Sequence, residues 1–147
     1  MPHFGLIDEN LREEEKYLLR ARLHLRGGKI RLNRGKISAG IAALYDAFIH
    51  ALYWYFLSKD HLKFYLYDIN GFIREERELY DFLVRYGEID GKFPIQKFMR
   101  ISEDALNLDL INFEEFELLE EFEDLMNQLA VLPYDEDLYP LADSVTL

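Results

Sequence analysis

The sequence predicts an all-α protein, an up-and-down bundle of four main helices with one additional short helix. Apolar residues recur at helical spacing through most of the chain, and no series of alternating residues marks a strand. Glycine or proline follows several of these periodic segments, at Gly35, Gly87 and Pro133. With 147 residues, half of them apolar, the chain can bury one sizeable core. We expect this domain to span residues 1–132, followed by an acidic tail at 133–147.

The first helix is predicted to begin near Asp8 or Asn10, where Asn10 and Glu13 fit a capping box, and to run to about Arg34. Its apolar stripe has heptad-like spacing and consists of Leu11, Leu18, Ala21, Leu25 and Leu32. Gly28 shares the stripe. Because the stripe keeps its phase through Gly27-Gly28, one continuous helix is favoured over two helices with a glycine hinge. The glycines would let the next helix approach closely.

The second helix, at 36–58, contains the longest apolar run, from Ile37 to Leu57, and a helix that is apolar on nearly every side must be surrounded. Its length would suit a bilayer. Asp46 and His50 lie near its middle, however, and a central Asp costs about 3 kcal/mol. We therefore expect no membrane span. The first ten residues lack a basic segment followed by an apolar one, so we also expect no signal peptide.

Three further helices are predicted at 72–86, 94–106 and from a capping box at Asn112 and Glu115 to about Leu132. Residues 59–71 are less regular, and Asn70-Gly71 marks a turn. The side chains expected to face the core are Phe72, Leu79, Leu83, Tyr86, Ile95, Phe98, Met99, Ala105, Phe116, Leu119, Phe122, Leu125, Met126 and Leu129.

Charge is divided along the chain, although the net charge is −11. Eight Lys or Arg and no acid lie between Lys16 and Tyr45, whereas fourteen acids and no Lys or Arg follow Arg100. The two regions either pair internally or face different partners. The chain has no cysteine, which excludes disulfides, thiolate metal sites and cysteine nucleophiles. Neither Glu-x-x-His nor another common metal motif occurs, so we expect no metal and no cofactor.

Asp46 and His50 form the sharpest candidate catalytic pair, because a spacing of four places them on the same side of one helix. Ser38 precedes them on that side and Trp54 follows. One interpretation is an Asp-oriented histidine that acts as acid, base or ligand in a cleft. The favoured interpretation is a polar strip facing solvent or a partner subunit, or a satisfied buried pair.

The basic residues of the first helix are candidates for binding phosphate or nucleic acid. This set consists of Arg22, Arg26, Lys29, Arg31 and Arg34. The alternative, which we favour, is a solvated basic face that the acidic last helix partly neutralises.

The segment LNRGKISAGIAALY at residues 32–45, between a long first helix and an Ala-rich apolar second helix, resembles the HEPN-like superfamily. That superfamily has a "leucine, two residues, glycine-lysine" turn before a second helix rich in small residues, in an up-and-down bundle. The likeness covers residues 8–132 in helix order and is residue-level around 32–57. It implies a cytoplasmic bacterial or archaeal protein, often dimeric, linked to minimal nucleotidyltransferases, toxin–antitoxin pairs or RNA cleavage.

Two features of the family are missing from this chain. The RNase branch carries Arg-x(4–6)-His in a late helix, whereas the last histidine here is His61. The Glu-Lys often seen in the second helix is also missing, with Ile49-His50 near that place. The resemblance therefore favours a non-catalytic, homodimeric, partner-binding bundle over a nucleotide- or RNA-directed enzyme.

The enzyme alternative makes its own prediction. If Asp46 and His50 supply acid–base catalysis while Arg22, Arg26 or Lys29 hold phosphate, His50→Ala should abolish cleavage or turnover in a protein that still folds. An RNA-cleavage or nucleotide-turnover assay on both proteins is the measurement, with circular dichroism to check folding. Activity that survives the substitution would remove His50 from this role.

Overall fold

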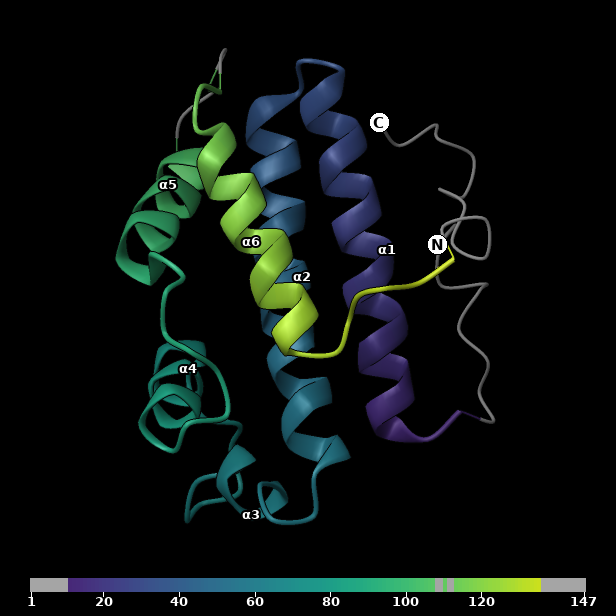
Figure 1. Cartoon of the computed structure of the whole chain (residues 1–147), viewed down its shortest axis with the longest axis vertical. Coiled ribbons are helices and arrows are strands. Elements are labelled where there is room, and N and C mark those ends of the chain that lie inside the picture. Colours follow the sequence, from purple (N-terminus) through teal and green to yellow (C-terminus); the bar gives the residue numbers. More distant parts are fainter. Residues whose placement is uncertain (1–10, 108–109, 111–112, 136–147) are drawn as a thin grey trace.

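The fold is described by a computed structural model for residues 11–107, 110 and 113–135. Within these residues the chain forms six helices, α1 (Glu13–Asn33), α2 (Ile37–Ser58), α3 (Lys63–Leu66), α4 (Glu76–Arg85), α5 (Ile95–Asn107) and α6 (Phe116–Gln128). Figure 1 shows α1 and α2 as a long antiparallel pair, with α4, α5 and α6 arranged about α2. No strand occurs in this part of the chain, where Tyr67 and Ile73 form an isolated bridge. The predicted all-α helical bundle is confirmed.

Two glycines allow α1 and α2 to approach closely. A Cβ atom on Gly28 would lie 2.8 Å from Leu44 Cδ2 and 3.0 Å from the carbonyl oxygen of Gly40. A Cβ atom on Gly40 would lie 2.8 Å from Leu32 Cγ and 3.0 Å from the carbonyl oxygen of Gly28. The contact is therefore reciprocal, and each backbone occupies the space that a side chain on the other would need. As predicted, α1 is one continuous helix through Gly27-Gly28.

Helix α2 is the central element, since it contacts α1, α3, α4 and α5. Half of its 22 residues are buried, in agreement with its apolar sequence. Phe48, Ala51, Leu52 and Phe56 have no exposed surface at all. Among the described helices, none combines the length and apolar character that a membrane crossing requires.

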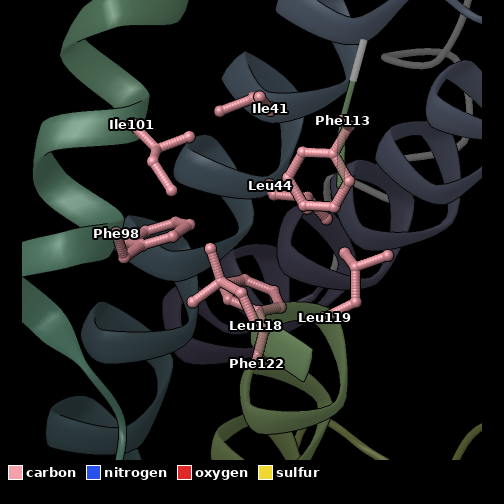
Figure 2. A pocket seen from close by; sticks show the side chains of 8 residues that line it. All are labelled: Ile41, Leu44, Phe98, Ile101, Phe113, Leu118, Leu119 and Phe122. Atoms are coloured by element: carbon pink, nitrogen blue, oxygen red, sulfur yellow. The ribbon is translucent and has the colours of Figure 1, made fainter. Parts of the chain in front are cut away.

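Helices α5 and α6 close the core against the first half of α2. Figure 2 shows side chains from the three helices converging, together with Phe113 from the segment before α6. They are Ile41 and Leu44 from α2, Phe98 and Ile101 from α5, and Leu118, Leu119 and Phe122 from α6. They leave an enclosed space of only about 10 Å³ with no polar lining, so this region is a packed core and not a ligand site.

The prediction for the third helix is wrong at its start. Helix α4 begins at Glu76, four residues later than expected, because residues 68–73 form a turn instead. The Asp68 carboxylate accepts hydrogen bonds from the backbone N–H groups of Asn70 and Phe72, which competes with helix formation. Phe72 is consequently 70% exposed, and Tyr86, just past the end of α4, is 62% exposed. Both had been expected to face the core.

The ends of α1 and α6 also differ from the prediction. Helix α1 begins at Glu13 with Arg12 as its N-cap, and the proposed starts at Asp8 and Asn10 lie outside the described residues. Asn112 also lies outside them, and α6 begins at Phe116, which is 67% exposed and not buried as expected.

Helix α6 ends at Gln128, before Pro133 is reached. Ala130 has a φ of 61°, and the N–H of Val131 returns to the carbonyl of Met126 at 2.9 Å. This reversal buries Leu129 and Val131 completely on either side of Ala130. Burial of these two side chains therefore accounts for the early end of the helix.

Gly40→Ala tests the contact between α1 and α2. Helix propensity alone would stabilise the protein by about 1 kcal/mol, whereas overpacking costs about 1–3 kcal/mol. We expect a net loss in the free energy of unfolding, measured by urea denaturation. Ala39→Gly, at the exposed neighbouring position, calibrates the propensity effect. If Gly40→Ala instead raises the free energy of unfolding by as much as Ala39→Gly lowers it, the helices are not in close contact at Gly40.

Candidate functional site

Two of the predicted phosphate-binding residues are engaged within the chain. Arg22 Nε donates a hydrogen bond to the carbonyl oxygen of Val131 at 2.9 Å, and its guanidinium lies 5.6 Å from the ring centre of Tyr134. Lys29 Nζ lies 3.6 Å from a carboxylate oxygen of Glu123 on α6. The expected neutralisation of the basic helix by the acidic last helix therefore occurs at this pair.

The other three basic residues lie further along α1 and just past its end. Arg26 and Arg31 are half-buried on α1, and burial lowers the pKa of Arg31 from its ordinary value. Arg34 is exposed at the end of α1, where its backbone N–H bonds to the carbonyls of Ile30 and Arg31. The predicted set thus extends along α1 from Arg22 to Arg34, just past the end of the helix.

The side of α2 that carries Ser38, Asp46, His50 and Trp54 holds neighbouring segments in place. The Ser38 hydroxyl accepts a hydrogen bond from the backbone N–H of Leu110 at 2.8 Å. Trp54 Nε1 donates to the carbonyl oxygen of Leu129 at 3.0 Å, directly after α6. Two of these four polar groups therefore anchor the chain on either side of α6.

Asp46 and His50 are joined through the main chain. His50 Nδ1 lies 2.8 Å from the carbonyl oxygen of Asp46. Because a carbonyl can only accept, Nδ1 carries the proton and Nε2 keeps its lone pair. The Asp46 side chain is partly exposed and acts on His50 through its charge, which favours the protonated imidazole. Partial burial raises the pKa of Asp46 itself.

His50 is packed in a group of rings between α1 and α2. Its ring stacks on His24 with centroids 5.5 Å apart and planes 10° apart, and on Tyr17 at 5.9 Å. Tyr53 meets both Tyr17 and His50 edge to face. The sequence interpretation missed His24 because the pairing across two helices depends on their register. In the sequence, only the glycines that let α1 and α2 approach, Gly28 and Gly40, could have indicated that register.

The electrostatics of this ring group keep His50 neutral. Burial is the largest of the effects that lower the pKa of His50, the nearby His24 and Arg20 also lower it, and the resulting pKa is about 4. The hydrogen bond to the Asp46 carbonyl and the Asp46 charge act in the opposite direction but are weaker. At neutral pH His50 is therefore an uncharged imidazole and a weak base. No group of three or more His, Cys, Asp or Glu that could hold a metal occurs among the residues described.

Sequence interpretation also missed a row of four aromatic side chains on α3, on α4 and just past the end of α4. Phe64, Tyr65, Phe82 and Tyr86 contact one another in succession, and we call them the aromatic surface. The Tyr65 and Phe82 rings stack with centroids 3.8 Å apart, and Phe82 and Tyr86 are 4.5 Å apart. Phe64 is 72% exposed, and Tyr86 is exposed as well. The visible signal is the spacing of four between Phe82 and Tyr86, of which only Tyr86 was predicted, as a residue facing the core.

The pKa of His50 predicts a specific sensitivity to acid. An unfolded imidazole takes up its proton near pH 6.5, whereas folded His50 does so only near pH 4. Between these values the unfolded state binds more protons, so stability falls as the pH is lowered. Protonation of His50 lowers the free energy of unfolding by at most about 3 kcal/mol.

His50→Phe keeps a ring in this place and removes the titration. We expect its urea midpoint to fall less than that of the wild type between about pH 7 and about pH 4.5. If the urea midpoints of the two proteins fall in parallel with pH, His50 titrates normally.

No family model, curated protein or solved structure matches the chain. The resemblance to the HEPN-like superfamily therefore stays a prediction that depends on residues 32–57. An all-α bundle is compatible with many activities, so function has to be inferred from the side chains that the fold presents.

Proposed function

We propose that the chain is a non-catalytic, HEPN-like interaction module that forms a homodimer through its aromatic surface. The observation that carries this proposal is the exposure of large apolar side chains at the end of the bundle that contains α3 and α4. Single exposed apolar residues are ordinary, but a connected row of aromatic rings is typical of protein interfaces. Tyrosine and phenylalanine also bury much area for little loss of side-chain freedom.

The turn beside the aromatic surface extends it. Ile69 is 98% exposed and Phe72 is 70% exposed. Arg74, just after the turn, donates from Nε to the carbonyl of Tyr65 at 2.9 Å, and its guanidinium lies 4.3 Å from the Tyr65 ring centre. The turn is thereby held next to α3. A surface in a fixed position loses less conformational entropy when it binds a partner.

Charges on α4 favour a second copy as the partner. Asp81 and Arg85 are exposed and lie on either side of Phe82 in the sequence of the helix. In an antiparallel pairing of two α4 helices, Asp81 of one copy would face Arg85 of the other, and the reverse. A two-fold interface requires this kind of self-complementarity. Asp81 also pairs with Arg77 Nε at 3.2 Å, but an exposed pair of this kind contributes little and can exchange partners.

Light scattering coupled to gel filtration tests this proposal. We expect the wild-type protein to have twice the mass of one chain, and the double variant Phe64→Ser/Tyr86→Ser to have the mass of one chain. Because both side chains are exposed, the variant should unfold at nearly the wild-type denaturant concentration. Phe116→Ser removes an equally exposed aromatic ring on α6 and should leave the dimer intact.

A wild-type protein with the mass of one chain over the whole concentration range would contradict the homodimer. A double variant that still dimerises would place the interface elsewhere on the molecule.

A further inference from the structure

A second site lies between α2 and α5, and none of the rings grouped around His50 lines it. It is an open cavity of about 230 Å³, lined by Tyr45 of α2 and by Met99, Ser102, Glu103 and Leu106 of α5. The four α5 residues follow a spacing of three and four, so they share one face of the helix. Leu106 is 72% exposed at this face, although it is a large apolar residue.

Ser102 is unusual for its position. It is only 4% exposed, and its hydroxyl oxygen has no hydrogen-bond partner within the described part of the chain. A buried hydroxyl without a partner costs stability, and native proteins keep few of them. Alanine would fill the same helical position without that cost. The hydroxyl beside the cavity is therefore best explained by a group that binds there.

The polar groups that line the cavity all carry lone pairs that can accept hydrogen bonds. Tyr45 Oη donates its proton to a carboxylate oxygen of Glu76 on α4, so the phenol oxygen has only lone pairs left. Burial, this hydrogen bond and the charges of Glu76 and Asp46 raise the pKa of Tyr45 far above its ordinary value, and the phenol stays protonated. The exposed carboxylate of Glu103 can only accept as well.

We propose that this cavity binds a primary ammonium group on an aliphatic stem. An ammonium has three donors and no acceptor, which complements the Ser102 hydroxyl, the Tyr45 oxygen and the Glu103 carboxylate. No Lys, Arg or His is among the lining residues to compete for these acceptors. The face of the Tyr45 ring favours a cation, and Met99 and Leu106 offer apolar walls for the stem. A lysine side chain of a protein and a free alkylamine share this chemistry.

Titration of the isotope-labelled full chain by NMR tests the proposal, with n-butylammonium and Nα-acetyl-lysine-N-methylamide as probes. We expect saturable shifts of the Tyr45, Ser102 and Glu103 signals with at least one probe. The probe that binds more tightly identifies the source of the ammonium group. n-Butanol and butyrate, which have the same chain length without the positive charge, should produce no saturable shifts. If neither ammonium probe saturates, or if n-butanol binds as well, the proposal is overturned.

Substitutions separate binding from folding. Glu103→Gln should weaken binding by about tenfold, the effect of losing one charged hydrogen bond, whereas Asp104→Asn on the same helix should have no effect. Ser102→Ala should also weaken binding, yet raise the melting temperature of the free protein by removing the unpaired hydroxyl. A Ser102→Ala protein that is destabilised, or that binds the amine as well as the wild type, would show that the hydroxyl has no part in the site.

Discussion

The close approach of α1 and α2 is the constraint on which the rest of the structure depends. Backbones can come this near only where Cβ atoms are missing. Gly28 on α1 and Gly40 on α2 meet this requirement, one on each helix. Once the two helices meet there, their antiparallel register is fixed. That register places Tyr17 beside Tyr53 and His24 against His50, and it leaves the other faces of α2 free for the shorter helices.

Much of the helical framework could be predicted because its apolar pattern is dense and its ends carry clear signals. The observed bounds of α2 and α5 agree with the prediction to within one residue. The errors concern Phe72, Tyr86 and Phe116, which have the helical phase of core residues but lie at or beyond helix ends. Periodicity tells which residues share a side, not whether another element covers that side. At Phe72, local hydrogen bonds to Asp68 also competed with the helix.

The candidate sites were less predictable because they depend on contacts between elements. Spacing placed Asp46 and His50 on one side of α2, but the same spacing lets the imidazole reach a main-chain carbonyl in place of a carboxylate. The charge pattern anticipated pairing between the basic and acidic regions, as at Lys29 and Glu123. It could not indicate that Tyr45 would meet Glu76 and leave a cavity of acceptors beside Ser102, since three helices contribute to that arrangement.

The hydrogen bond from Arg22 to Val131 has a consequence for the order of folding, because it joins residues 109 positions apart. Helices α1 and α2 are neighbours in the sequence with a connection of only three residues, so their pairing needs little loop closure. The Arg22 contact has to close a much longer loop. Sequence separation therefore favours the pairing of α1 and α2 before this contact. Arg22 ties the segment after α6 back to α1.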